Sequence, residues 1–193
     1  MIATYSRPGG RVNPLRLTPT DIRIEDIAHA LSLTNRFCGM TRFPISVAQH
    51  SAWASWICAP PDALQALLHD ASEAYLHDVS KWVKQTPEFA GYRVAEARAQ
   101  HVIYDAFGLP HEDAPSVEYA DRVLVRWEGE QGFGHGWRVE SDPGVPHADY
   151  PPLTADERAS LDDWEPWAWH IAERQFLRRF AELTTGQRAR VPA

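Results

Sequence analysis

The chain has 193 residues, of which 44% are hydrophobic and 23% are charged, and its net charge is −7 at pH 7. This length suits one domain with a substantial core, and the composition excludes wholesale disorder. The acidic balance argues against a protein that coats nucleic acid or is held on an anionic membrane surface.

Hydrophobic spacing, caps and Pro/Gly breaks predict the elements in chain order. They are an extended lead-in over 1–20, helices over 21–35, 45–59 and 64–75, a short turn or helix over 80–84, helices over 87–109 and 113–127, an irregular loop over 128–153 that is a candidate lid, and a helical region over 154–183 interrupted near Pro166. Strand-like alternation is never longer than a few residues. The pattern predicts an all-α fold in a single domain, with residues 24–127 as its helical core.

The apolar segment Leu64–Tyr75 carries ionisable groups where burial penalises their charge. His69 and Asp70 are neighbours among leucines and alanines, and Glu73 follows one turn later. An ionised carboxylate in such surroundings costs several kcal/mol unless a partner or a metal takes up its charge. The second His-Asp pair, at residues 77–78, falls where the apolar periodicity lapses, and a loop is expected there. The first pair is therefore the candidate ligand pair.

Four ionisable residues fall on apolar faces of three predicted helices: His50, His69, Asp70 and Asp121. A single histidine on an apolar face is more often a hydrogen-bonded core residue, at roughly three to one. Four such groups together favour a site. Two imidazoles and two carboxylates make a mixed nitrogen and oxygen donor set, suited to Mn, Co, Ni, Fe or Zn.

These residues stand in three segments, Val47-Ala-Gln-His50-Ser51, Leu68-His69-Asp70-Ala-Ser-Glu73-Ala74 and Glu118-Tyr-Ala-Asp121-Arg122. In their order they resemble the H…HD…D signature of HD-domain metal-dependent phosphohydrolases. Within that superfamily the chain is most similar to bacterial 5′-deoxynucleotidases and to phage-type dATP triphosphohydrolases, over about residues 24–127. The resemblance implies an HD-type helical bundle around one divalent metal ion (Mn, Co, Ni, Fe, Zn or Mg). The implied metal ligands are His50, His69, Asp70 and Asp121.

The activity that the resemblance implies is hydrolysis of a (deoxy)nucleotide, with Asp70 and Glu73 as the catalytic residues. Glu73 is the candidate general acid or base, and its alternative is a solvated helix carboxylate. Removal of phosphate by a 5′-nucleotidase is the first expectation. A dATP-like triphosphohydrolase that releases polyphosphate and a non-catalytic module that senses a nucleotide are the alternatives. A purely structural helical protein would not need four buried ionisable groups.

Substrate contacts are expected on both sides of the metal-binding segments. The resemblance matches Arg36 to a phosphate-contacting arginine and Asp78 to an acid that contacts the sugar 3′-hydroxyl. Phe37 stands where the deoxynucleotidases carry a tryptophan packed against the sugar. Lys81 and Lys84 are candidates for neutralising further phosphates, since each carries a cation.

The remaining features concern location and partners. Two cysteines without a short CxxC spacing, no signal peptide and no apolar run as long as a membrane span predict a cytoplasmic protein with reduced thiols. The expected partner is a small nucleotide, with neither a nucleic-acid polymer nor a membrane, and the resemblance implies a homo-oligomer. Trp164, Trp167 and Trp169 are expected to cap the core or to line a dimer interface.

Overall fold

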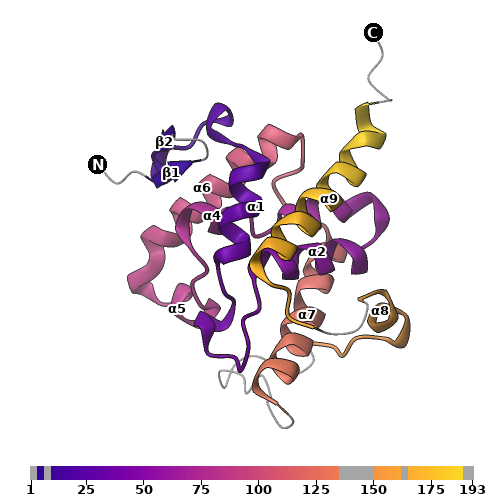
Figure 1. Cartoon of the computed structure of the whole chain (residues 1–193). Helices are drawn as coiled ribbons and strands as arrows, with labels where there is room; N and C mark the ends of the chain where they lie inside the picture. The colour runs from indigo at the N-terminus through magenta and orange to yellow at the C-terminus, as the bar shows by residue number, and fades with distance from the viewer. Residues whose placement is uncertain (1–3, 7–9, 135–149, 162–164, 189–193) are drawn as a thin grey trace.

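Figure 1 shows the computed structural model, in which helices pack around a central helix and a short strand pair lies at one side. The structure describes residues 4–6, 10–134, 150–161 and 165–188. The strands are β1 (Thr4–Ser6) and β2 (Gly10–Val12), and the α-helices are α1 (Ile24–Leu33), α2 (Val47–Ile57), α3 (Ala63–Leu68), α4 (Glu73–Leu76), α5 (Lys81–Lys84), α6 (Ala90–Phe107), α7 (Pro115–Phe133), α8 (Ala155–Ser160) and α9 (Trp169–Arg188). Single 3₁₀ turns are η1 (Pro14–Arg16), η2 (Pro19–Asp21), η3 (Phe37–Gly39), η4 (Pro60–Asp62) and η5 (Pro87–Phe89). The chain is mainly helical, as the sequence predicts.

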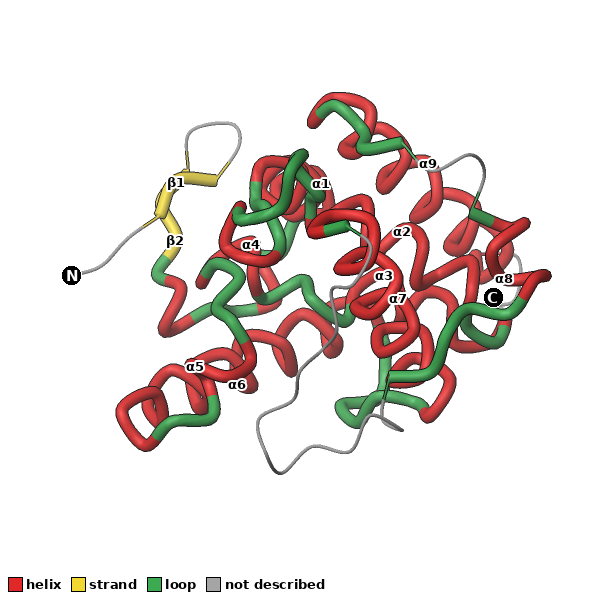
Figure 2. Tube along the Cα trace, turned by 90° about the horizontal axis from the view of Figure 1, so that it is seen from below, coloured by secondary structure: helices red, strands yellow, loops and turns green. Residues whose placement is uncertain are grey.

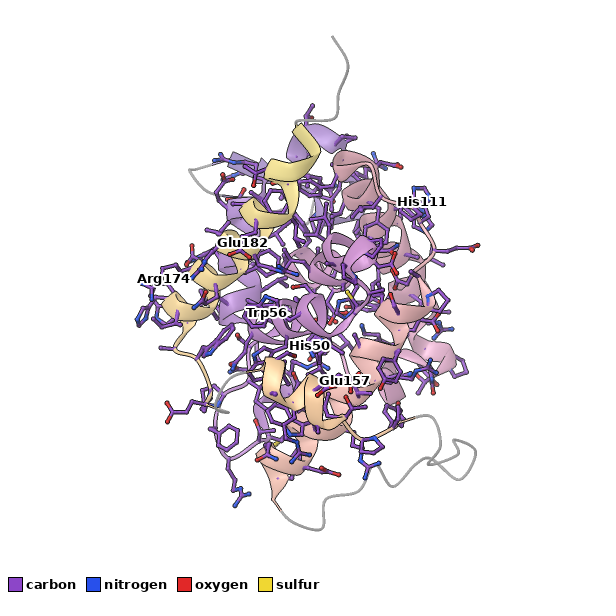
Figure 3. The ribbon with its side chains drawn as sticks, turned by 90° about the vertical axis from the view of Figure 1, so that its right-hand side faces the viewer. His50, Trp56, His111, Glu157, Arg174 and Glu182 are labelled. Carbon is purple, nitrogen blue, oxygen red and sulfur yellow. The ribbon has the colours of Figure 1, made fainter. Side chains whose placement is uncertain are left out.

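Helix α2 is the centre of the bundle. Ser46 caps its first turn by accepting a hydrogen bond from the backbone amide of Gln49 at 3.2 Å. Every residue from Val47 to Ser55 is buried, because α1, α3, α7 and α9 all pack against this helix. Figure 2 shows α2 between α9 on one side and α3 and α7 on the other. His50 therefore lies deep inside the molecule, where Figure 3 also places it.

Helix α9 lies across α1 and α2 and closes one side of the core (Figure 1). Ala172 and Phe176 of α9 are fully buried there. Trp167, just before this helix, packs edge-on against Trp53 and Trp56 of α2, with ring centroids 5.6 and 6.0 Å apart. This residue caps the core, which is one of the two roles expected of the C-terminal tryptophans. Trp169 is 49% exposed, and Trp164 lies outside the described residues.

The predicted continuous helix over Leu64–Tyr75 is wrong at its middle. Helix α3 ends at Leu68 and α4 begins at Glu73, and the residues between them form a tight turn. The side chain of Gln100 on α6 donates from Nε2 to the Leu68 carbonyl at 2.7 Å and accepts at Oε1 from the Ser72 amide at 2.9 Å. Hydrophobic periodicity reports only on neighbouring residues, so it predicts an uninterrupted helix. The side chain that bonds to this turn lies 28 residues beyond Ser72 and leaves no mark on the local pattern.

The predicted loop over 128–153 begins too early, since α7 continues to Phe133. Sequence reasoning treats the glycines at 129 and 132 as helix breakers. At Gly132 the missing side chain serves packing instead, because a Cβ there would lie 2.4 Å from Cγ2 of Thr41. Residues 135–149 of the predicted loop, and with them the candidate lid, lie outside the described residues.

The predicted extended lead-in contains a strand pair. Strands β1 and β2 run antiparallel with Tyr5 opposite Arg11, and two 3₁₀ turns lead from them to α1. At the other end, α8 and α9 occupy the predicted helical region on either side of Pro166, and α9 continues to Arg188. Within the described part of the chain, no helix is both long and apolar enough to cross a membrane.

Candidate metal centre

Three helical segments bring the four predicted ligands together. One donor atom from each of His50, His69 and Asp121 lies within 4.8 Å of the other two. His50 Nε2 is 3.3 Å from His69 Nε2 and 3.2 Å from Asp121 Oδ1. Asp70 joins the group, with Oδ2 3.4 Å from His69 Nε2 and 3.8 Å from His50 Nε2. Residues 71 positions apart in the sequence thus present nitrogen and oxygen donors to one point.

The two imidazoles are oriented by their other ring nitrogens. His50 Nδ1 is 2.9 Å from Oε1 of Glu128, and His69 Nδ1 is 2.8 Å from the carbonyl oxygen of Ala66. An ionised carboxylate and a carbonyl can only accept, so each Nδ1 carries a proton and donates it. Both Nε2 atoms are then directed at the cluster. A ligating histidine commonly uses its second nitrogen in this way, which fixes the tautomer and the ring orientation.

Glu128 is the residue that sequence reasoning missed at this centre. Its side chain is fully buried and bridges two groups, because Oε1 accepts from His50 and Oε2 accepts from Arg36 Nε at 2.9 Å. A signal for it existed. Glu128 lies seven residues after Asp121 on α7, which is two helical turns and hence the same face.

The cluster is partly buried and carries more negative than positive charge, so a cation can be accommodated. Asp70, Asp121 and Glu128 are three carboxylates, and Arg36 is the guanidinium among them, 3.3 Å from Asp70 and 3.8 Å from Asp121. Two negative charges remain when both imidazoles are neutral. A divalent cation would neutralise them, and imidazole with carboxylate is a donor set that such cations bind. The residues present therefore fit a divalent metal ion.

Without a metal the histidines take up protons in its place. Burial lowers the pKa of His69, but the charges of Asp70 and Asp121 outweigh that effect and raise it to about 10. Burial also lowers the pKa of His50, while Glu128 and Asp121 raise it above the ordinary value. The imidazoles in turn hold the pKa of Asp121 well below its usual range, against the opposing effect of burial. Protons and metal should therefore compete for the same nitrogens.

Glu73 lies beside this cluster, but its pKa is shifted in the opposite direction from that of Asp121. Burial and the negative charges of Asp70 and Asp78 raise its pKa well above the ordinary value, and Lys84 only partly opposes them. Within the described structure, Glu73 Oε2 is buried and has no hydrogen-bond partner. A carboxyl group in these surroundings retains its proton closer to neutral pH, as a general acid requires.

Arg36 begins a backbone stretch with unusual torsion angles. Phe37 and Cys38 have φ of +54° and +53°, a region that costs a residue with a side chain of order 1 kcal/mol or more. The stretch is held at its start by the Arg36 amide, which donates to the Ile45 carbonyl at 2.8 Å. Its far end is held by the Arg42 amide, which donates to the Gly132 carbonyl at 2.9 Å. This arrangement turns Arg36 inward, where it is 8% exposed.

A cavity of about 620 Å³ opens over the cluster. Every residue predicted to bind substrate lines it, together with three of the predicted ligand or catalytic residues: Arg36, Phe37, Asp78, Lys81, Lys84, Asp70, Glu73 and Asp121. The volume is in the range of small-molecule sites. The two histidines complete the cluster beneath this wall, since their side chains are 0% and 7% exposed.

The two lysines of the cavity wall differ in their surroundings. Lys84 Nζ is 3.4 Å from Oε1 of Glu73 and also donates to Glu96. Burial lowers its pKa, but Glu73 and Glu96 raise it further, so Lys84 stays charged. Its charge is paired with Glu96, and its contact with Glu73 Oε1 can persist as a hydrogen bond when Glu73 carries a proton. Lys81 makes no ion pair among the described residues, and its Nζ lies 5.8 Å from the ring centroid of Tyr150. Lys81 is the better placed of the two to meet an incoming anion.

A methionine and two aromatic residues of the wall also escaped sequence reasoning: Met40, Phe133 and Tyr150. Phe133 packs edge-on against Phe37, with centroids 5.6 Å apart. Phe133 and Tyr150 come from the predicted loop over 128–153, where no periodic pattern indicates which side chains face inward. They add apolar surface to a cavity that is also lined by charged residues.

Comparison with known proteins places the chain among bacterial relatives. No protein-family model matches it. YfdR of Escherichia coli K12 is 35% identical over 113 residues, which are 58% of this chain and 62% of YfdR. A Rhodobacter capsulatus protein is 38% identical over 139 residues, which are 65% of this chain and 70% of that protein. The chain belongs to the family of the Rhodobacter protein.

YfdR and the Rhodobacter protein are both described as uncharacterized proteins, so the similarity assigns no activity to this chain. The chain spans somewhat less than two thirds of the length of YfdR.

Proposed function

We propose that the protein is a divalent-metal-dependent phosphohydrolase with an HD-type bundle, and that it removes phosphate from a nucleoside 5′-monophosphate. The observation that carries this proposal is the donor set of His50, His69, Asp70 and Asp121 at the floor of a cavity that also contains Glu73. A divalent cation held by these residues would supply Lewis-acid polarisation of a phosphate ester. The remaining chemistry belongs to the protein's own side chains.

Glu73 is suited to proton transfer. As water attacks phosphorus and the bond from phosphorus to the departing alcohol breaks, the raised pKa and the unpartnered oxygen of Glu73 leave a proton available to that alcohol's oxygen. Arg36 is fixed through Nε by Glu128, so its two terminal nitrogens face the carboxylates of the cluster, where they can also meet phosphate oxygens. Asp78 lies in the same wall, where it can accept a hydrogen bond from a sugar hydroxyl.

The small number of cations in the described cavity wall that are free to meet a substrate favours a monophosphate over a triphosphate. A triphosphate tail needs several cations along its length. Lys84 is already bonded to Glu73 and Glu96. Arg42, a further cation near Arg36 in the sequence that could meet a triphosphate, is not among the described residues that line the cavity. In this part of the chain, the cations that remain available to a substrate are Lys81 and the terminal nitrogens of Arg36, and these are sufficient to bind one phosphate group. The aromatic side formed by Phe37, Phe133 and Tyr150 provides a surface on which a base can stack.

The experiment is a product analysis of the purified full chain loaded separately with Mn²⁺, Co²⁺, Mg²⁺ or Zn²⁺. Nucleoside mono- and triphosphates are supplied, and phosphate, pyrophosphate and tripolyphosphate are quantified. We expect phosphate from monophosphates and loss of activity in Asp121→Asn, which removes the negative charge of one proposed ligand. Release of tripolyphosphate would support the triphosphohydrolase. Tight nucleotide binding without turnover would support the sensing module and overturn the proposal.

A further inference from the structure

Gln100 interrupts the helix that carries the metal-ligand candidates. Its side-chain amide reaches from α6 to the turn between α3 and α4, with Nε2 on the Leu68 carbonyl and Oε1 on the Ser72 amide, at 2.7 and 2.9 Å. In a continuous α-helix these two backbone groups would bond to each other, because the amide of residue i pairs with the carbonyl of residue i−4. Gln100 therefore bonds to both the acceptor and the donor that would form one hydrogen bond of a continuous helix.

The turn tightens where that bond is replaced. The amides of four residues in or beside it bond to the carbonyl three residues earlier rather than four: Ala71, Glu73, Ala74 and Tyr75. In such 3₁₀ geometry the side chains at i and i+3 are eclipsed, whereas in an α-helix they point about 60° apart. Asp70 and Glu73 have this spacing. The tight turn consequently sends both carboxylates into the same cavity wall.

We infer that Gln100 is a positioning residue that aligns Glu73 with the metal-ligand candidate Asp70. When Gln100 cannot bond, the Leu68 carbonyl and the Ser72 amide are free to pair directly. The helix would then run on, and Glu73 would point about 60° away from the direction of Asp70. The geometry stands independently, but the consequence for proton transfer rests on the proposed function.

A second side chain of α6 supports the same segment. Tyr92 donates from its hydroxyl to the His77 carbonyl at 2.7 Å, at the end of α4. His77 has φ of +67°, and this turn of the backbone leads into Asp78 of the cavity wall. Helix α6 thus holds the segment that contains Asp70, Glu73 and Asp78 at two points.

Gln65 provides a matched control, because its side-chain amide also bonds to backbone groups of another segment but does so away from Glu73. Its Nε2 donates to the carbonyls of Pro110 and Glu112 at 3.1 and 2.9 Å, and its Oε1 accepts from the Ala114 amide at 3.1 Å. These bonds join α3 to the start of α7 and do not involve the turn after Leu68. Gln65→Leu removes hydrogen bonds of the same type as Gln100→Leu does, but leaves the alignment of Glu73 untouched.

The experiment is a double-mutant cycle on the full-length, metal-loaded protein. Gln100→Leu and Gln65→Leu are each made alone and together with Glu73→Gln, and kcat is measured with a nucleoside monophosphate. Proton transfer by a positioned group contributes about 10²- to 10⁴-fold, so we expect Gln100→Leu alone to lower kcat about 10- to 100-fold. It should add nothing in the Glu73→Gln background. Gln65→Leu should lower Tm and leave kcat unchanged. An equal loss from Gln100→Leu in both backgrounds would overturn the inference.

A readout independent of turnover is the crystal structure of metal-free Gln100→Leu. We expect a direct hydrogen bond from the Ser72 amide to the Leu68 carbonyl and a Glu73 carboxylate turned out of the cavity wall. A variant that retains the tight turn overturns the inference, whatever the activity. If the wild-type protein hydrolyses no nucleotide, the proposed function fails while this structure still decides the alignment. Should Gln100→Leu not fold, Gln100→Met, whose flexible side chain also removes both hydrogen bonds, is read in the same way.

Discussion

Replacement of Glu128 by glutamine should destabilise the protein far more than the same replacement of Glu130, an exposed glutamate on the same helix. Glu128 is fully buried, and its two oxygens are each 2.9 Å from a donor, on His50 and on Arg36. Removing one partner of a buried ion pair costs about 3–5 kcal/mol. Glutamine keeps one acceptor, and Arg36 retains Asp70 at 3.3 Å, so we expect the lower end, about 3 kcal/mol.

The assay is urea and thermal unfolding of the metal-free protein, followed by calorimetric titration with Mn²⁺. For a chain of this length, 1 kcal/mol shifts Tm by about 2–4 °C, so the expected loss is about 6–12 °C. Glu128 also orients the imidazole of His50, a proposed metal ligand, and removal of such a partner commonly weakens metal affinity about 10- to 100-fold. Glu128→Gln should therefore lose both stability and metal affinity.

The matched control is Glu130→Gln. Glu130 bonds to Arg126 at the same distance, 2.9 Å, but its side chain is 40% exposed. Exposed pairs of this spacing contribute about 0.3–0.5 kcal/mol, so this variant should be almost as stable as the wild type and bind metal normally. If both variants lose the same stability, burial is not what gives Glu128 its effect. Normal Mn²⁺ affinity in Glu128→Gln would refute its link to His50.

Glu73→Gln should retain metal and slow turnover about 10²-fold or more, and an unchanged kcat would remove Glu73 from the mechanism. The pKa of His69 is raised from 6.5 to about 10 in the folded metal-free protein, so its contribution to stability is complete below pH 6.5 and lost as pH rises to about 10. Tm of the metal-free protein should fall across that window, and His69→Gln should flatten the fall. Gly132→Ala should destabilise by about 1–3 kcal/mol in urea, because its Cβ would meet Thr41 at 2.4 Å. Gly91→Ala, where nothing lies within 4 Å, should stabilise by about 0.5–1 kcal/mol; equal effects would contradict the packing argument.

Local sequence patterns predicted most of the helices, because apolar period, caps and proline breaks act within a few residues. Helix α2 lies within two residues of its predicted ends, at Val47 and Ile57. The pattern failed where a distant group intervenes. The side chain of Gln100 bonds to both ends of the α3–α4 interruption, and α7 continues to Phe133 with Gly132 packed closely against Thr41.

The sequence by itself determined which donors are available and which helix faces they occupy, since residue type and spacing are local properties. It therefore predicted that His50, His69, Asp70 and Asp121 belong to one site. Only the tertiary structure decided how the donors are held and which charges are already committed. Glu128 meets Arg36 across 92 residues of sequence, and Lys84 is taken up by Glu73 and Glu96. Such pairings depend on which side chains packing brings within hydrogen-bond reach, and no pattern within a single helix carries that information.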